Sequence, residues 1–362
     1  MSNNKLSILK KFWKGKKVFL TGHTGFKGTW LSIFLNLLGA KVYGYSLKPN
    51  TQPSFFNLIN FNKKIHTSMI GDIRNYNKLK KAISKFSPHF IVHMAAQPLV
   101  RDSYLDPKYT YEVNTLGTIN ILNILQELNF IKSALIITTD KVYFNDNKKK
   151  YFKENDLLGG LDPYSNSKSC AELAVNSYNY SFFKQKKIYV ATARAGNVIG
   201  GGDFSKDRII PDYFRSLLKK NRKLFMRSPN SIRPWQHVLE PLYGYLLLLM
   251  KLHAKKIKSG SHFNFGPKNS SNKSVDKVIT LLNKNFKNSV EIIKKKESLK
   301  NHKESKVLML NSNKSKKILK WNSQFNLEQS LKLTSIWFKK YINKKNRDIL
   351  KVTQDQIIEY LR

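Results

Sequence analysis

The sequence of 362 residues contains a single cysteine, Cys170, which excludes an internal disulfide and suits the reducing cytoplasm. Long apolar runs are also missing. The longest, YGYLLLLM at residues 243–250, is too short to cross a bilayer and predicts a buried helix. The opening residues, MSNNKLSILKKFWKGKK, have neither the apolar segment nor the cleavage site of a secretion signal. We therefore expect a cytoplasmic protein without a membrane anchor.

Acidic residues are scarce: 23 Asp and Glu stand against 65 Lys and Arg, which gives a formal net charge of +42. A charge of this size raises the question of nucleic-acid binding. Only 10 of the basic residues are arginines, the residue that dominates base and phosphate recognition, and the lysines are spread along the whole chain. We interpret the lysines as a solvated surface and predict no specific nucleic-acid partner. A non-catalytic nucleic-acid binder remains an alternative.

A glycine-rich turn stands between two β-rich segments in KKVFLTGHTGFKGTWLSIFLNLLGAKVYGYSL, which starts at Lys16. Residues 18–20 predict a strand, the apolar spacing over 30–38 predicts a helix that ends at Gly39, and residues 42–47 predict a second strand. Gly22 allows the tight turn, Gly25 lets the backbone approach a diphosphate, and Gly28 lets the helix pack on its strand. This order of elements predicts a dinucleotide-binding βαβ unit.

The second strand lacks the carboxylate that normally binds the ribose 2′-hydroxyl of NAD. That region reads Tyr45, Ser46, Leu47 and Lys48. The feature therefore does not separate NAD from NADP, because Lys48 either meets a 2′-phosphate or is an exposed loop lysine.

Predicted strands and helices continue to alternate through the first half of the chain. This alternation predicts an α/β fold: a Rossmann-type, doubly wound parallel sheet with a smaller α/β substrate domain after it. Asp72, Ala95, Ala96 and Thr139 all lie at the carboxyl ends of predicted strands, where ligands bind in such sheets. We expect these residues at one edge of the sheet.

Two groups of residues carry acid–base chemistry. Thr139, Asp140 and Lys141 stand side by side where the strand ALII ends. Tyr164 and Lys168 are four residues apart at the start of a helix that Pro163 favours, so they share one face. An ammonium and an oxidised nicotinamide near a phenol favour the phenolate, so we expect Tyr164 to act as a base.

Long strings in the sequence carry a family resemblance: GHTGFKGTWL, HMAAQPLVR, TTDKVY, DPYSNSKSCAEL, ARAGNVIGGGD and RPWQHVLEPLYGYLLL. From about Lys16 to Tyr341 the chain resembles the extended short-chain dehydrogenase/reductase family. Within it, the chain resembles most the NAD-dependent nucleotide-sugar 4,6-dehydratases of the CDP-glucose branch. The resemblance implies a hydro-lyase that converts CDP-glucose to its 4-dehydro-6-deoxy derivative and water, for deoxysugar and surface-polysaccharide (lipopolysaccharide O-antigen) synthesis.

The same resemblance implies catalytic roles. Tyr164, supported by Lys168, would accept the proton of the sugar 4-hydroxyl, and Thr139 would hydrogen-bond the 4-oxygen. Most such enzymes have Glu as the base for the C5 hydrogen where this chain and the CDP-glucose branch have Lys141. A lysine needs burial or a cationic neighbour to act as a base. Asp140 would protonate the leaving 6-hydroxyl; the alternative is that Asp140 and Lys141 only pair with each other.

The resemblance also implies the binding residues. Cofactor contacts would come from Gly22, Thr24, Gly25, Phe26, Lys27, Gly28, Asp72, Ile73, Ala95, Ala96, Gln97, Asn114, Tyr164 and Lys168. Substrate contacts would come from Gln97, Asn197, Arg208, Arg233 and Trp235, with the arginines on the diphosphate. Trp235 either stacks on the substrate or packs in the core. No metal-ligand cluster is present, and a homodimer or homotetramer is expected.

We predict four segments: a loose basic lead-in over 1–15, an NAD-binding Rossmann domain with the catalytic residues over 16–195, a mainly substrate-binding domain over 196–345 with some segments returning to the first domain, and a C-terminal helix over 346–362. A 4-epimerase, or a dehydratase for another nucleotide sugar, is the main alternative function. An epimerase needs no acid for dehydration, so the Asp140–Lys141 pair disfavours it.

Overall fold

A parallel sheet of seven strands forms the centre of the computed structural model, which describes residues 3–59, 67–131, 133–146, 150–294, 307–343 and 348–362. Its strand order is β12-β7-β5-β4-β1-β2-β3, and every neighbouring pair is parallel. This order confirms the predicted doubly wound Rossmann-type sheet. The strands are β1 (Lys17–Thr21), β2 (Lys41–Ser46), β3 (Thr67–Ile70), β4 (Phe90–His93), β5 (Ser133–Ile137), β7 (Tyr189–Ala195) and β12 (Ser261–Phe265).

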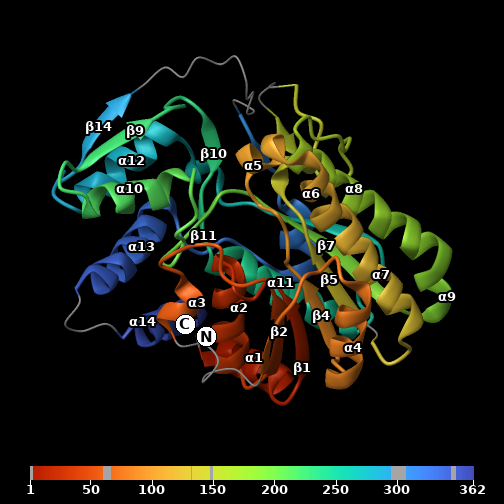
Figure 1. Ribbon diagram of the computed structural model, residues 1–362. Coiled ribbons are helices and arrows are strands. Elements are labelled where there is room, and N and C mark those ends of the chain that lie inside the picture. Colours follow the sequence, from red (N-terminus) through yellow and green to blue (C-terminus); the bar gives the residue numbers. More distant parts are fainter. Residues whose placement is uncertain (1–2, 60–66, 132, 147–149, 295–306, 344–347) are drawn as a thin grey trace.

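Helices cover both faces of the sheet (Figure 1). Alternate residues of each strand enter two separate cores: in β5, Leu135 faces one core and Ile136 the other. On one face lie α2 (Phe26–Leu37) and α11 (Leu239–His253); on the other lie α4 (Tyr76–Phe86), α7 (Gly117–Glu127) and α8 (Pro163–Tyr178). In the described part of the chain, no helix has the length and apolarity needed to span a membrane.

The predicted βαβ unit is present with small shifts of its ends. The strand predicted over 18–20 is β1, the helix is α2, and the strand predicted over 42–47 is β2. Gly39 follows α2 with φ of +82°, a conformation that favours glycine and ends the helix.

One helical run over residues 107–127 has three parts. It consists of α6 (Pro107–Tyr111), a π-helical turn (Glu112–Leu116) and α7. The turn packs against α8, as do α6 and α7. The adjacent α5 (Val100–Leu105) also contacts α8, so this group of helices surrounds the helix that carries Tyr164.

A smaller lobe is built from the chain after β7. It contains α10 (Ile209–Leu218), α12 (Val275–Lys284), the parallel pair β9 (Lys223–Met226) and β14 (Glu291–Lys294), and the antiparallel pair β10 (Ile232–Pro234) and β13 (Asn272–Ser274). Between these segments α11 and β12 return to the central sheet. The remaining α-helices and strands are α3 (Phe55–Leu58), β6 (Tyr151–Phe152), α9 (Lys184–Lys186), β8 (Val198–Ile199), β11 (Gln236–His237), β15 (Met309–Leu310) and the two long helices α13 (Leu327–Ile342) and α14 (Ile349–Leu361).

The first residues are not loose, contrary to our expectation for 1–15. Residues Asn3–Trp13 form α1, in which Leu9 and Trp13 are fully buried in the main core. The many lysines of this helix obscured its sparse apolar face in the sequence. That face consists of Leu6, Leu9 and Trp13, whose spacing of three and four residues is helical.

Candidate active site

The two predicted catalytic groups lie together at the carboxyl end of β5. Thr139 caps a short 3₁₀ turn, Asp140–Val142, that directly follows the strand. Tyr164 stands in the first turn of α8, where Asp162 caps the helix through its side chain. One turn later, the Lys168 ammonium donates to the carbonyl of Ile137 over 3.1 Å, which fixes the helix against the strand end.

Hydrogen bonds connect the side chains at this strand end. The Thr139 hydroxyl donates to Oδ1 of Asp140 over 3.1 Å and accepts from the Lys141 backbone N–H over 3.3 Å. Tyr164 lies close enough to Thr139 for the Thr139 side chain to influence the pKa of its hydroxyl. Oδ2 of Asp140 is buried and has no hydrogen-bond partner in another described residue. An unpaired buried carboxyl oxygen is costly and indicates a group made to meet a ligand or a proton.

Burial sets the protonation of Asp140. Its side chain is 3% exposed, and burial raises its pKa to about 6, against the opposing charges of Lys141 and Arg233. Gly196 lies against it: a Cβ at this glycine would be 2.8 Å from Oδ2. A carboxyl group with this pKa holds its proton in a useful fraction of molecules near neutral pH, as a general acid requires.

Burial raises the pKa of Tyr164 to about 12, while the Thr139 side chain and the charge of Arg208 lower it. Arg208, expected on the substrate diphosphate, is therefore also a cation that favours the phenolate. The Lys168 ammonium donates to the backbone of β5, and its support of the phenolate remains a prediction.

Lys27, in the first turn of α2, also belongs to this site, although the sequence predicted only a cofactor contact for it. Its ammonium donates to the hydroxyl of the fully buried Tyr245 over 3.0 Å. Burial lowers the pKa of Lys27 to about 7, and the charges of Arg208 and Lys168 lower it further while Asp140 raises it. Tyr245 was missed because it lies in the apolar run 243–250 and has no local motif; only the contact between α2 and α11 reveals it.

The glycine turn has the geometry of a diphosphate cradle. Gly22 has φ of +76°, and a Cβ on it would lie 2.8 Å from the Ala95 nitrogen. A Cβ on Gly28 would lie 2.1 Å from the Gly22 carbonyl oxygen, so both glycines are required sterically. Gly25 caps α2 without any side-chain hydrogen bond, which leaves the first N–H groups of the helix for a ligand.

The other predicted cofactor contacts of this turn have different surroundings. Thr24 hydrogen-bonds Ser46 and the Leu47 carbonyl, both over 2.9 Å, and so ties the turn to the end of β2. Phe26 is partly buried against the main core. Lys48 is exposed.

Asp72, Ile73, Ala95 and Ala96 lie at strand ends of the same sheet edge. The Asp72 carboxylate forms an ion pair with Arg74 over 2.8 Å, and Arg74 lowers the pKa of Asp72. Asp72 remains partly exposed. Ile73 is buried in the second core. Ala95 donates its N–H to the Thr21 hydroxyl and, like Ala96, is partly exposed.

Gln97 and Asn114 are bonded to each other. The Asn114 amide accepts from the Gln97 N–H over 2.9 Å and donates to its carbonyl over 3.1 Å. The Gln97 side chain bonds Leu99 and Thr110, and both predicted contact residues are buried. In this structure they shape the loop after β4, and a direct contact with a ligand remains a prediction.

The predicted substrate residues border the site from the second half of the chain. Arg208 is partly exposed and bonds Asp203 over 3.2 Å. Arg233 is 5% exposed, and its charge lowers the pKa of Asp140. Asn197 is partly buried beside β8. Trp235 is buried and donates its indole N–H to the Lys273 carbonyl, so it packs in the interior, the second of the two roles considered for it. Its contact with a substrate remains a prediction.

No cluster of three or more His, Cys, Asp or Glu side chains with the geometry of a metal site occurs among the described residues. The chemistry of the strand-end site instead rests on hydroxyl, carboxyl and ammonium groups.

The family model described as GDP-mannose 4,6 dehydratase matches residues 19–334, which includes every one of these catalytic candidates. The chain belongs to the GDP-mannose 4,6 dehydratase family. A curated CDP-glucose 4,6-dehydratase of Salmonella typhimurium is 42% identical over 98% of this chain and 98% of its own length. The match is thus end to end rather than confined to the glycine turn.

Solved structures agree with this family fold. A dTDP-glucose 4,6-dehydratase of Bacillus anthracis in complex with NAD has a TM-score of 0.74 at 22% identity, covering 93% of this chain and all of the other. A UDP-glucose 4-epimerase of Thermotoga maritima with UDP-glucose has a TM-score of 0.77 at 20% identity, covering 90% of this chain and all of the other. At these identities the likeness establishes the fold.

The raised pKa of Asp140 predicts a pH-dependent stability. The folded protein binds a proton at this group up to about pH 6, whereas the unfolded chain releases it near pH 4. Folded wild type therefore loses stability as pH rises from 4 to 6. Relative to wild type, Asp140→Asn should gain free energy of unfolding over this range, by up to about 3 kcal/mol.

The measurement is urea unfolding at several pH values. The control is Asp355→Asn, an exposed position on α14. If the difference between Asp140→Asn and wild type is the same at pH 4 and pH 7, the raised pKa is wrong.

Proposed function

We propose that this chain is a CDP-glucose 4,6-dehydratase, a cytoplasmic hydro-lyase that forms CDP-4-dehydro-6-deoxy-glucose and water. The observation that carries the proposal is the turn Thr139–Lys141, with the buried Asp140, lying beside Tyr164 at the carboxyl end of β5. An oxidation alone needs the hydroxyl groups and the tyrosine. The additional buried carboxyl of Asp140 supplies the acid that a dehydration requires.

The cofactor of the proposed reaction is NAD. The glycine cradle supports this, because a Cβ at Gly22 or Gly28 would fill it and Gly25 leaves the start of α2 uncapped. Thr24, Phe26, Lys27, Asp72, Ile73, Ala95, Ala96 and Asn114 are the further residues that would hold it. NAD supplies a hydride acceptor for C4 and afterwards a hydride donor for C6, so the reaction has no net redox change.

Tyr164 and Thr139 serve the oxidation at C4. The Tyr164 phenolate accepts the proton of the 4-hydroxyl while Thr139 donates to the 4-oxygen. Burial disfavours the phenolate, and the positive charge of Arg208 together with the Thr139 hydrogen bond compensates for part of this cost. Lys168 fixes α8 against β5 and adds a buried ammonium near the same position.

Asp140 and Lys141 serve the elimination. A ketone at C4 acidifies the C5 hydrogen, and the Lys141 amine removes it as a proton. The protonated Asp140 gives its proton to the departing 6-hydroxyl, which leaves as water. The buried, unpaired Oδ2 of Asp140 supports this role because it needs a partner that the protein does not supply.

Arg208 and Arg233 would bind the diphosphate of the substrate. They come from two different elements, Arg208 from the start of α10 and Arg233 from β10, and the charge of each influences the pKa of a catalytic group. An arginine guanidinium suits a diphosphate because its planar N–H groups can bind two oxygens at once.

The two alternatives are weaker. A 4-epimerase does not need an acid that donates to the 6-oxygen. In such an enzyme Asp140 would be a buried carboxyl that destabilises the fold without a role in the reaction. A nucleic-acid binder would have no use for the buried site at the end of β5.

The proposal predicts selectivity for the nucleotide. With CDP-, dTDP-, UDP- and GDP-glucose supplied at equal concentration, the protein loaded with NAD should convert CDP-glucose fastest. The readout is the absorbance of 4-keto-6-deoxy products in base, with Tyr164→Phe as the inactive control. Equal conversion of another nucleotide-glucose, or activity with NADP above that with NAD, would contradict the assignment.

Single-turnover variants separate oxidation from elimination. Tyr164→Phe should block cofactor reduction. Asp140→Asn should leave cofactor reduction largely intact and slow water loss by about 10²–10⁴-fold, so that reduced cofactor and 4-keto-glucose nucleotide accumulate. Lys141→Met should slow exchange of the C5 hydrogen with solvent deuterium. Wild-type elimination rates in both the Asp140 and Lys141 variants would refute the assigned roles.

We also propose that α8 forms a homodimer interface. Apolar side chains remain exposed on and beside this helix: Leu173 is 56% exposed, Tyr180 85% and Leu116 53%. The turn that carries Leu116 contacts α8, and Tyr180 lies in the helical turn that continues α8. Exposed apolar side chains gathered on neighbouring elements are typical of protein interfaces.

Leu173→Glu should therefore convert a dimer into a monomer in sedimentation velocity, because a charge in an apolar interface must lose its water shell. The matched control is Leu218→Glu, equally exposed (57%) but on α10 in the smaller lobe. A wild-type protein that sediments as a monomer, or a Leu173→Glu protein that stays dimeric, would remove α8 as the interface.

A further inference from the structure

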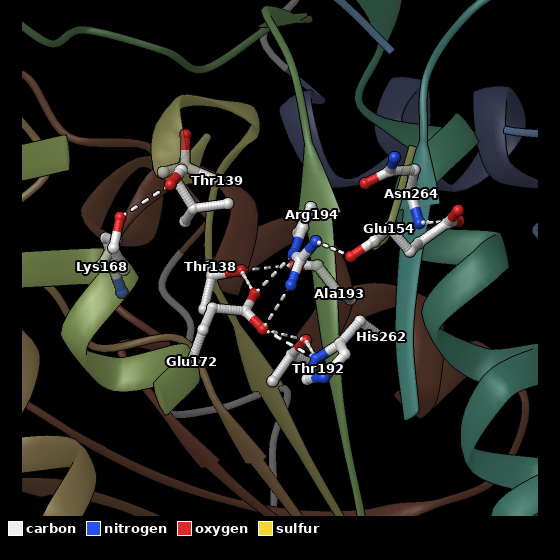
Figure 2. A network of polar contacts seen from close by, with 12 residues as sticks. Thr138, Thr139, Glu154, Lys168, Glu172, Thr192, Ala193, Arg194, His262 and Asn264 are labelled. Carbon is white, nitrogen blue, oxygen red and sulfur yellow. Dashed lines mark hydrogen bonds and ion pairs between the residues drawn. The ribbon is translucent and has the colours of Figure 1, made fainter. Parts of the chain in front are cut away.

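A fully buried carboxylate, Glu172, lies one helical turn beyond Lys168 on α8. No role follows for it from the reaction described above. Figure 2 shows Glu172 between the end of β5 and strand β7, with Thr138, Thr192, Arg194 and His262 pointing towards its carboxylate. The residue therefore connects the catalytic helix with three strands of the sheet.

Each oxygen of Glu172 is saturated with donors. Oε1 accepts from the Thr138 hydroxyl over 2.5 Å and from Nε of Arg194 over 2.9 Å. Oε2 accepts from the Thr192 hydroxyl over 2.6 Å and from Nη2 of Arg194 over 2.9 Å, and lies 2.9 Å from Nδ1 of His262. The arginine grip is bidentate, and both members of the ion pair are at most 1% exposed.

Stability alone does not account for such a pair. Removing two charges from water costs several kcal/mol per ion, and well-packed apolar residues of similar volume often stabilise a fold as well or better. The position of the pair suggests a different reason. Thr138, which donates to Glu172, immediately precedes Thr139, and Ile137, which accepts from Lys168, precedes Thr138.

Consecutive turns of α8 thus hold consecutive residues of the strand end. The Lys168 ammonium binds the carbonyl of Ile137, and the Glu172 carboxylate binds the hydroxyl of Thr138. Tyr164 lies one turn before Lys168 on the same helix. The two contacts therefore fix the position of the helical turn that carries Tyr164 relative to the strand end that carries Thr139.

The charge of Glu172 also acts on Lys168. Burial lowers the pKa of Lys168 to about 8, and the Glu172 carboxylate raises it. Other groups interact with Lys168 from neighbouring elements. Lys27 on α2 opposes its charge, and His93 on β4 is neutral because burial lowers its pKa to about 3. Glu172 is thus the anion that offsets the cost of a buried ammonium.

We propose that Glu172 is a positioning residue for the reaction: it locks α8 to the end of β5 and keeps Lys168 in its ammonium form. This inference rests on the proposed function, because the ammonium matters through the Tyr164 chemistry. It predicts that loss of the carboxylate affects the charge state of Lys168 and not only the stability of the fold.

Four variants test the proposal. Glu172→Gln removes the charge, and Glu172→Asp keeps it on a shorter side chain. Since Glu172→Gln leaves Arg194 buried without its counter-ion, the double variant Glu172→Gln/Arg194→Met provides an uncharged pair that can fold. The control is Tyr360→Phe, which removes a buried hydrogen bond to a different carboxylate, Glu240, 2.8 Å away on α11.

The first readout is the titration of the Lys168 Nζ by ¹⁵N NMR in protein without added cofactor, assigned by its loss in Lys168→Arg. In Glu172→Gln the titration should move to lower pH by about one unit, and in the double variant, which removes a negative and a positive charge together, the shift should be smaller. In Glu172→Asp and Tyr360→Phe it should stay within a few tenths of wild type.

The second readout is the pH profile of cofactor reduction in a single turnover. A lower pKa means that Lys168 loses its proton at lower pH, so the rate of cofactor reduction should begin to fall at a lower pH than in wild type. Relative to wild type, the rate of Glu172→Gln should fall about tenfold more at pH 8.5 than at pH 6.5. Tyr360→Phe should keep the wild-type profile.

The outcomes distinguish the two proposals. An unchanged Lys168 titration in a folded Glu172→Gln protein overturns the role of Glu172, whatever the activity. A shifted titration in a protein that does not convert CDP-glucose supports the coupling of Glu172 to Lys168 and refutes the proposed function.

Discussion

The site depends on the packing of α8 against the carboxyl end of β5. A parallel strand delivers its last residues to the same edge as its neighbours, but their side chains become a site only when a second element supplies the complementary groups. Here Lys168 and Glu172 bond to Ile137 and Thr138, so the helix cannot slide along the strand without breaking buried polar contacts. The position of Tyr164 beside Thr139 follows from this registration.

Burial is the physical constraint that gives these groups their chemistry. The same low-dielectric surroundings raise the pKa of Asp140 to about 6 and lower that of Lys27 to about 7. Each shift moves a group towards neutral pH, where proton transfer in either direction is efficient. The fold is destabilised by these unpaired or half-paired groups, and the two extensive apolar cores on either side of the sheet compensate for that cost.

The surface and the interior of the protein use charge differently. The lysine excess lies mostly on the outside, in exposed positions such as Lys10 and Lys48. In the interior, the described charges are few and are placed next to one another, as in the Glu172–Arg194 pair and in Arg233 near Asp140. The net charge of the protein therefore says little about its function, whereas the few buried charges account for most of that function.

The sequence by itself determined the parallel fold, the glycine cradle and the catalytic candidates, because each is encoded in contiguous residues. Glycine spacing follows from local sterics, and Tyr164 and Lys168 share a face through helix periodicity. Only the tertiary structure decided that α1 belongs to the core, that Trp235 packs inside, that Gln97 and Asn114 bond to each other, and that Lys27 meets Tyr245. It also decided that the charge of Arg208, 44 positions further along the chain, lowers the pKa of Tyr164. These relations join residues from 17 to more than 200 positions apart. Their pKa values depend on burial and on neighbouring charges in space, which no local pattern of residues encodes.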